Sequence, residues 1–297
     1  MRPLLSFAGF IITFERPDVL ASTINRVFSQ TLPPTKLWII DNSRTDLTQQ
    51  MVGSWNDSRL IYYRTGANLG PAGGAKIGLA LASAEGYEWI FWGDDDDPPP
   101  HADTFEKLLE VRFLPDNSIG QVGMVGQYFN FRTGMIRRVT DEELNANEWI
   151  KIDTIAGGQC KIVKSAVFVK GAMPTEKLFF GFEELDFDIQ LKSLGFTSWV
   201  RTDLFLLQRK EPLRYEHIRS KLLDKSSLWR QYYSLRNLLH IFRKNSMYLA
   251  FMILILRRSA KSIYSFRFGW SYGSSLCKYT LLGIRDWLTN RFGYKEF

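Results

Sequence analysis

Short apolar runs alternate with helical patterns along the first half of the chain. Residues 7–14 form an apolar run typical of a buried parallel strand, and residues 16–18 interrupt it before a helical pattern over 19–28. Later strand-like runs occupy residues 37–40, 60–63 and 89–92, with helical stretches between them. This alternation predicts an α/β fold whose central sheet is mainly parallel and flanked by helices.

The second half of the chain continues with strand-like segments and then becomes helical. Residues 122–126 and 162–169 are apolar enough for buried strands, and a helix is expected from Glu183 to about Gly195, where glycine provides a C-cap. Residues 229–242 are helical again. We therefore expect two regions, an α/β domain over residues 1–212 and a helical extension over residues 213–297.

Charge is distributed unevenly between these regions. The net charge is +7, and residues 209–297 hold 18 Lys+Arg and 5 Asp+Glu, against 20 and 26 in the first 208 residues. Residues 247–256 are uninterruptedly apolar, but spanning a bilayer needs roughly 20 residues. Basic and aromatic residues then interleave over 257–270. This pattern fits a helix lying on an anionic membrane surface, or a helical pair that packs on the core or forms a homo-oligomer.

The N-terminus and the cysteines both favour the cytoplasm. Residues 1–17 alternate like a strand and lack the small-residue cleavage site of a signal peptide. Cys160 and Cys277 stand far apart without a Cys-x-x-Cys or Cys/His cluster, so neither a disulfide framework nor a zinc site is indicated. We expect two reduced thiols.

Four aspartates, Asp94 to Asp97, follow directly after the apolar run 89–92. Neighbouring carboxylates raise each other's pKa unless a cation or solvent relieves the repulsion, and a solvated acidic loop is one interpretation. However, Thr13, Asp41 and the four aspartates all fall at carboxyl ends of predicted parallel strands, where α/β proteins bind ligands. Two aspartates one residue apart can hold Mg²⁺ or Mn²⁺ while the metal bridges two phosphates.

A glycine-rich loop is expected over residues 66–74, and the segment 68–76, NLGPAGGAK, is rich in small residues. Its backbone can approach a ligand closely and Lys76 can meet a phosphate, although glycine-rich helix starts are common. The segment is not a Walker sequence, and no GxGxxG follows the first strand, which disfavours a nicotinamide-dependent enzyme.

Six motifs occur in a characteristic order: IITFERP (11–17), IDNS (40–43), NLGPAGG (68–74), DDD (94–96), FGFEELD (180–186) and YYSLRN (232–237). Together they resemble family 2 inverting glycosyltransferases, especially rhamnosyl- and galactofuranosyltransferases of bacterial surface polysaccharides, over roughly residues 7–240. The resemblance implies a GT-A fold, a nucleotide-diphosphate sugar donor, a glycan or lipid-linked glycan acceptor, a divalent metal (Mn²⁺ or Mg²⁺) and single displacement with inversion.

The resemblance also assigns residues to the donor and the metal. The implied donor-nucleotide residues are Thr13, Phe14, Arg16, Asp41, Asn68, Gly70, Lys76, Asp94 and Asp95. Among them, Asp41 is implied to hydrogen-bond the base and Asp94 to face the ribose or the sugar, while Asp96 binds the metal with help from Asp94. Two registers of the aspartates are open, 94–96 and 95–97, and the strand start at Trp89 favours the first.

The implied catalytic base is the second acid of a pair, Glu184, at a position where Asp is more usual. The longer side chain of Glu leaves Asp186 and Glu183 as alternatives, since a base must reach the acceptor hydroxyl. A competing interpretation is that Glu183, Asp186 and Asp188 face solvent at a helix N-terminus, where the dipole favours acids.

Three further residues complete the predicted site. Related enzymes often place a metal-binding histidine near the position of Gln208, and His217 is a candidate replacement. Gly157 and Gly158 mark a close backbone approach and are assigned to the acceptor.

Two other functions are weighed against this one. A sugar-nucleotide pyrophosphorylase would also use an α/β domain and Mg²⁺, but its glycine-rich loop should follow the first strand directly. A nucleic-acid-binding protein would use the basic C-terminal region and would not need the aspartates. We prefer a cytoplasmic glycosyltransferase, peripheral on the inner face of the cell membrane, and do not expect nucleic acid as a partner.

Overall fold

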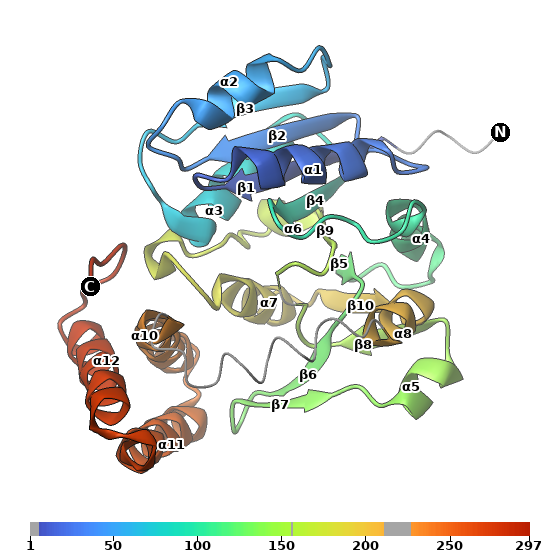
Figure 1. Ribbon diagram of the computed structural model, residues 1–297. Coiled ribbons are helices and arrows are strands. Elements are labelled where there is room, and N and C mark those ends of the chain that lie inside the picture. Colours follow the sequence, from blue (N-terminus) through green and yellow to red (C-terminus); the bar gives the residue numbers. More distant parts are fainter. Residues whose placement is uncertain (1–5, 156, 211–226) are drawn as a thin grey trace.

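A central β-sheet organises the computed structural model, which describes residues 6–155, 157–210 and 227–297. Its strands are β1 (Ala8–Thr13), β2 (Lys36–Asp41), β3 (Leu60–Arg64), β4 (Trp89–Asp94), β5 (Ile119–Gly123), β8 (Trp149–Ile152), β9 (Lys161–Lys164) and β10 (Thr197–Arg201). The eight strands lie in the order β3-β2-β1-β4-β9-β5-β10-β8 (Figure 1). The strands from β3 to β4 are parallel, whereas β9 and β8 run antiparallel to their neighbours. The predicted α/β fold with a mainly parallel sheet is confirmed.

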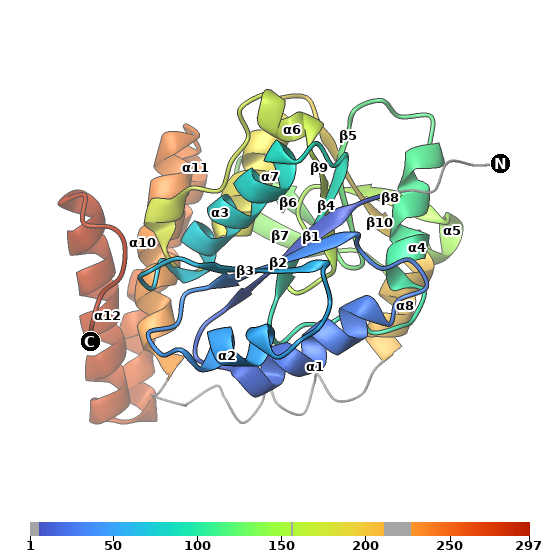
Figure 2. The same ribbon diagram turned by 90° about the horizontal axis from the view of Figure 1, so that it is seen from above.

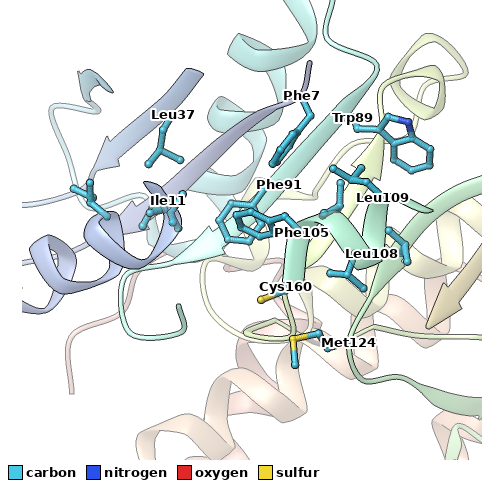
Figure 3. Packing of buried hydrophobic residues seen from close by; sticks show 14 of the residues in the cluster. Phe7, Ile11, Leu37, Trp89, Phe91, Phe105, Leu108, Leu109, Met124 and Cys160 are labelled. Carbon is cyan, nitrogen blue, oxygen red and sulfur yellow. The ribbon is translucent and has the colours of Figure 1, made fainter. Parts of the chain in front are cut away.

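Helices cover both faces of this sheet, which explains why its strands are continuous apolar runs. The helices α1 (Pro17–Phe28), α2 (Leu47–Gly53) and α4 (Thr104–Leu109) cover one face, and α3 (Gly70–Ala84), α6 (Ala166–Val169) and α7 (Glu183–Ser193) cover the other (Figure 2). On the first face, the ring of Phe105 lies 5.5 Å from that of Phe7 and 4.7 Å from that of Phe91 (Figure 3). Packing on both faces of the sheet therefore holds the ends of its strands in position.

Two predicted segments differ from the structure. The stretch 66–74 was expected to be a loop, but α3 begins at Gly70, because small residues let this helix lie directly on β1. A Cβ atom at Gly78 would come within 2.3 Å of the Phe10 ring. The stretch 162–169 is not one strand: β9 ends at Lys164 and the short helix α6 follows.

The first region also contains several short elements besides the sheet and the helices that cover it. They are η1 (Glu110–Phe113), a separate hairpin of β6 (Gln127–Asn130) and β7 (Met135–Arg138), α5 (Asp141–Ala146), η2 (Glu176–Leu178) and α8 (Thr202–Lys210).

Three helices form the C-terminal region: α10 (Trp229–Lys244), α11 (Tyr248–Tyr264) and α12 (Trp270–Leu288), with the short turn η4 (Ser265–Phe268) before α12. They lie together at one end of the molecule, with α10 against both α11 and α12 (Figure 1). Within the described residues, no helix has the length and apolarity to cross a membrane. The predicted boundary between residues 212 and 213 falls outside the described residues.

Candidate active site

Three strand ends bring the predicted site together. Thr13 pairs with Asp41 across β1 and β2, and Ile12 pairs with Asp94 across β1 and β4. Beyond this edge lies a cavity of about 910 Å³. The predicted residues that line it are Thr13, Phe14, Arg16, Asn68, Gly70, Asp94, Asp95, Asp96, Gly157, Glu183 and Glu184. Residues more than 170 positions apart therefore share one site.

The aspartates after β4 have different environments. Asp95 is buried, accepts a hydrogen bond from Thr13 Oγ1 at 2.7 Å and forms an ion pair with Arg16. Asp96 is exposed, and its Oδ2 atom lies 2.8 Å from Nη1 of the same Arg16 guanidinium. Asp97 lies outside the main cavity, in a smaller one of about 200 Å³. Asp94 and Asp96 thus both line the main cavity, Asp96 as the partner of Arg16 and Asp94 without an ion pair among the described residues.

Two glutamates at the start of α7 line the cavity together with Asp94. Glu183 is buried, and its Oε2 atom has no hydrogen-bond partner among the described residues. The loop before it has positive φ angles at Phe179 (64°), Gly181 (81°) and Phe182 (69°), a conformation that is strained for phenylalanine. The alternative interpretation that Glu183, Asp186 and Asp188 face solvent is wrong, because all three are buried.

Crowding of these carboxylates changes their proton affinities. Burial, and then the nearby charges of Glu184 and Asp96, raise the pKa of Asp94 to about 8. Burial likewise raises the pKa of Glu183 well above its usual range, and Glu184 adds to the effect. The pKa of Glu184 is also raised by burial, while Lys161 opposes that shift. The ligand-free cavity therefore has an affinity for positive charge, either protons or a cation.

Gly157 separates Asp94 from Glu184. A Cβ atom at Gly157 would lie 2.2 Å from Glu184 Oε1 and 3.5 Å from Asp94 Oδ2, and the Gly157 backbone hydrogen-bonds Glu184. Gly158, by contrast, is next to Asp97 and lines the smaller cavity. Only Gly157 of the two predicted acceptor glycines is brought to the main site.

Three other predicted residues are placed elsewhere. Asp41 is fully buried, where its carboxylate accepts hydrogen bonds from Tyr62 at 2.7 Å and from the Ser43 amide at 2.8 Å. Lys76 pairs with Glu176 at 2.9 Å and does not line the cavity.

Asp186 is also buried outside the cavity, because it points toward α10 and accepts from Gln190 at 2.8 Å and from Lys244 at 3.2 Å. These contacts give Asp186 a role in holding α7 against α10. His217 lies outside the described residues.

A buried ion pair lies behind the glutamates, and no sequence pattern indicates it. Lys161 of β9 and Asp188 of α7 are each 1% exposed and 2.9 Å apart. Asp188 also accepts from Gln121 at 2.7 Å and from the Ile155 amide at 2.8 Å. This pair links α7 to β9 of the sheet. Because Asp188 is one helical turn after Glu184, the pair also brings the positive charge of Lys161 near the glutamates.

A second set of contacts comes from the YYSLRN motif of α10. The Asn237 amide donates to the carbonyls of Leu178, Phe180 and Gly181 at 3.0, 3.0 and 2.9 Å. Arg236, 1% exposed, donates to the Leu178 carbonyl at 2.9 Å. We call Arg236 and Asn237 the loop clamp, since they hold the strained turn that precedes Glu183.

The donor set of the cavity fits a hard divalent cation. Carboxylate oxygens are the ligands that Mg²⁺ and Mn²⁺ prefer, and Asp94 and Asp96 supply them in a site with excess negative charge. In the described part of the chain, no three Asp, Glu, His or Cys side chains converge into a complete metal site. A cation bound here would therefore take further oxygen ligands from a substrate or from water.

A mainly parallel sheet with helices on both faces and a cluster of acids at the end of β4 is the arrangement of a GT-A glycosyltransferase. The family model described as "Glycosyl transferase family 2" matches residues 10–170, which is more than half of the chain. The chain belongs to this family, so the predicted membership is confirmed.

Curated relatives match parts of the chain. Galactofuranosyltransferase GlfT1 of Mycolicibacterium smegmatis is 26% identical over 166 residues, which cover 53% of this chain and 54% of that protein. Abequosyltransferase RfbV of Salmonella typhimurium is 33% identical over 97 residues, covering 31% and 28% of the two chains. The chain thus spans about half the length of the first of these relatives, and less of the second.

Solved structures extend the likeness of the fold to nearly the whole chain. Mannosyltransferase PcManGT from Pyrobaculum calidifontis, in complex with GDP-Man and Mn²⁺, has a TM-score of 0.55 at 14% identity, covering 96% of this chain and 87% of its own. S. aureus TarS 1-349 in complex with UDP has a TM-score of 0.52 at 12% identity, covering 96% and 92%. Both likenesses concern the fold.

We predict that Asp94→Asn stabilises the ligand-free, metal-free protein as pH rises. A raised folded-state pKa means that the stability linked to this carboxyl is fully present below its unfolded pKa of 3.8 and is lost up to about pH 8. In EDTA, the variant should gain on the order of 2 kcal/mol at pH 8, or roughly 4–8 °C in Tm. Differential scanning fluorimetry from pH 5 to 8.5 measures the gain. The exposed Asp18→Asn is the control, and an equal gain for it would contradict the prediction.

A second prediction concerns the loop clamp. Asn237→Leu keeps the size of the side chain but removes the side-chain donor of the Phe180 and Gly181 carbonyls, while the Leu178 carbonyl keeps Arg236. The free energy of unfolding should therefore fall by about 1–3 kcal/mol. Turnover should also fall at temperatures where the variant remains folded, because the turn before Glu183 loses hydrogen bonds that hold it. Asn245→Leu is the matched control at the C-cap of the same helix, since the Asn245 side-chain amide donates to the Ile241 carbonyl in the last turn of α10. Equal effects of the two variants on turnover at 20 °C would remove the positioning role.

Proposed function

We propose that this protein is an inverting glycosyltransferase that moves a sugar from a nucleotide-diphosphate donor to a hydroxyl of a glycan or lipid-linked glycan. The observation that carries the proposal is one cavity lined both by the aspartates at the end of β4 and by the glutamate pair at the start of α7. The first group suits a diphosphate with its cation, and the second suits removal of a proton. Membership of glycosyl transferase family 2 supports the first assignment, since the matched residues 10–170 include the aspartates.

The proposed reaction is a single displacement at the anomeric carbon. The acceptor oxygen forms a bond to this carbon while the bond to the diphosphate oxygen breaks, and the leaving nucleoside diphosphate takes the electron pair. Glu184 accepts the proton of the acceptor hydroxyl. Its raised pKa suits this role, since a general base works best when its proton affinity is near the operating pH.

Glu183 supports Glu184 in this scheme without replacing it. Glu184 is only partly buried, whereas Glu183 is 4% exposed, and burial raises the pKa of both carboxyls. A carboxyl that retains its proton in this way donates a hydrogen bond and limits repulsion beside the base. These differences favour the predicted assignment of Glu184.

Asp94 and Asp96 are the residues that would hold Mn²⁺ or Mg²⁺. Such a cation neutralises negative charge that develops on a diphosphate leaving group. Arg16, which is paired with both Asp95 and Asp96, holds the aspartate segment against the first loop. This arrangement favours the register Asp94–Asp96 over Asp95–Asp97, because Asp97 belongs to the smaller cavity.

The donor is proposed to carry UDP or dTDP, with galactofuranose or rhamnose as the sugar. A relative named galactofuranosyltransferase and one named abequosyltransferase make furanosyl and deoxyhexosyl groups the first candidates. The pyrophosphorylase alternative is less well supported, since the matched family is one of glycosyl transfer and Lys76 is tied to Glu176 away from the cavity.

We predict that Glu184→Gln lowers turnover by about 10²–10⁴-fold while donor binding changes little, because the amide cannot accept the proton. A thermal-shift screen of UDP-, dTDP- and GDP-sugars with Mn²⁺ identifies the donor, since a bound ligand raises Tm by mass action. Release of nucleoside diphosphate from that donor then measures turnover.

Two companion variants make this test selective. Asp96→Ala should lose the metal-dependent part of the nucleotide shift, and Glu183→Gln should retain more activity than Glu184→Gln. Full turnover by Glu184→Gln would remove the assignment of the base. The absence of a shift with every nucleotide sugar would contradict the proposed function itself.

The C-terminal region is proposed to bind an anionic membrane surface. Ile263, Phe268 and Trp270 are 73%, 51% and 80% exposed at the turn between α11 and α12, and Arg267 lies among them. Aromatic and aliphatic side chains next to basic residues suit insertion at a lipid interface, with roughly 1 kcal/mol from each basic residue near anionic lipid.

We predict that Ile263→Asn, Phe268→Ser and Trp270→Ser together abolish most sedimentation with phosphatidylcholine–phosphatidylglycerol vesicles. Truncation after Lys244 is a poorer test, because α12 packs on α10 and would be lost as well. Phe113→Ser is the control, since Phe113 is 55% exposed in η1, beside α4 at the other end of the molecule (Figure 1). Unchanged sedimentation of the triple variant would exclude this membrane contact, and a change in oligomeric mass would favour a homo-oligomer instead.

A further inference from the structure

The same cavity has a second wall that the proposed donor chemistry does not use. It is formed by Phe180 in the turn before α7, by Trp229, Arg230 and Tyr233 at the start of α10, and by Tyr294 and Phe297 after α12. We call these six residues the aromatic wall. They come from three separate segments, two of them in the C-terminal region.

Contacts among these side chains hold the aromatic wall in place. The ring of Trp229 lies 4.9 Å from that of Phe180 and 5.8 Å from that of Tyr233. The Tyr233 hydroxyl accepts a hydrogen bond from the Lys295 amide at 2.9 Å. The Lys295 ammonium binds the buried Asp286 at 2.5 Å, which fixes the segment that contains Tyr294 and Phe297. The wall is therefore preformed, and little conformational entropy is lost when a ligand binds to it.

Such a surface suits a sugar ring. A pyranose or furanose has C–H groups on one face and hydroxyls around its edge, so it can pack on an aromatic ring while polar tips meet the hydroxyls. Tyr294 and Phe297 are 54% and 47% exposed, so their rings are accessible to a ligand.

Arg230 adds a positive charge to this wall. Its guanidinium carbon lies 5.5 Å from the centre of the Trp229 ring and 5.7 Å from that of Phe180. Within the described ranges of the chain, no carboxylate forms an ion pair with Arg230, in contrast to Arg16 at the strand edge. A guanidinium held on aromatic rings binds phosphate through parallel N–H donors.

We infer that the aromatic wall is the acceptor subsite, and that it takes a glycan bearing a phosphate or diphosphate, whose sugar packs on the rings and whose anionic group binds Arg230. This inference rests on the proposed function, because it assumes that the strand edge takes the donor. A phosphate could also come from the donor itself, so the test separates the two sources.

The test uses two independent readouts. Octyl glycosyl phosphates of glucose, galactose, rhamnose and N-acetylglucosamine are compared with the matching neutral octyl glycosides by saturation-transfer NMR, in the presence of UDP and Mg²⁺. A thermal-shift titration with nucleoside diphosphates reports the donor site separately. We expect at least one glycosyl phosphate to bind about tenfold more tightly than its neutral counterpart.

Variants connect this preference to named residues. Arg230→Gln should remove the preference for the phosphate, while Trp229→Ala and Tyr294→Ala should weaken both members of a pair, and none should change the nucleotide shift. Arg243→Gln is the matched control, because Arg243 is an exposed arginine of the same helix that contacts Tyr248 away from the cavity.

The contrary results are distinct from failure of the proposed function. A nucleotide shift without any preference for glycosyl phosphates would overturn the acceptor subsite and leave the donor site standing. Loss of the nucleotide shift in Arg230→Gln, with glycoside binding unchanged, would assign Arg230 to the donor. If the wild-type protein shows no nucleotide shift, the proposed function falls and this inference falls with it.

Discussion

Repulsion between carboxylates at the end of β4 and the start of α7 is the constraint on which the rest of the site depends. Asp94, Asp96, Glu183 and Glu184 line one partly buried cavity, where the charges of Glu184 and Asp96 raise the pKa of Asp94 and those of Glu184 and Asp94 raise the pKa of Glu183. The fold tolerates this through Arg16 on one side and the buried Lys161 on the other. Such an arrangement is costly in an empty protein and becomes favourable when a cation enters.

The C-terminal helices belong to the site as well as to the surface. The loop clamp on α10 satisfies carbonyls of a turn with two phenylalanines at positive φ, and this turn leads directly into the glutamates. Lys244 of the same helix holds Asp186 of α7. Because Arg236 and Asn237 are buried, the position of α10 is coupled to that of the turn before the glutamates.

Much of the architecture could be predicted from local patterns. The apolar runs that became β1, β2 and β4 are buried on both faces, so their sequence is unambiguous, and the position of Asp94 at the end of β4 follows from it. Lys161 could not be found in this way, because a lysine in a short strand carries no signal of its partner on α7. Likewise, nothing local distinguishes Glu183 and Glu184, which face the cavity, from Asp186, which faces α10.

The sequence by itself determined the alternation of strands and helices, the placement of aspartates at a strand end and the family, since each depends on residues close together in the chain or on motif order. Only the tertiary structure decided which acids share the cavity, that Gly157 and not Gly158 lies between Asp94 and Glu184, and that residues 294–297 reach the same cavity. Those facts depend on packing between segments far apart in sequence, where direction and burial of each side chain are set by its neighbours in space.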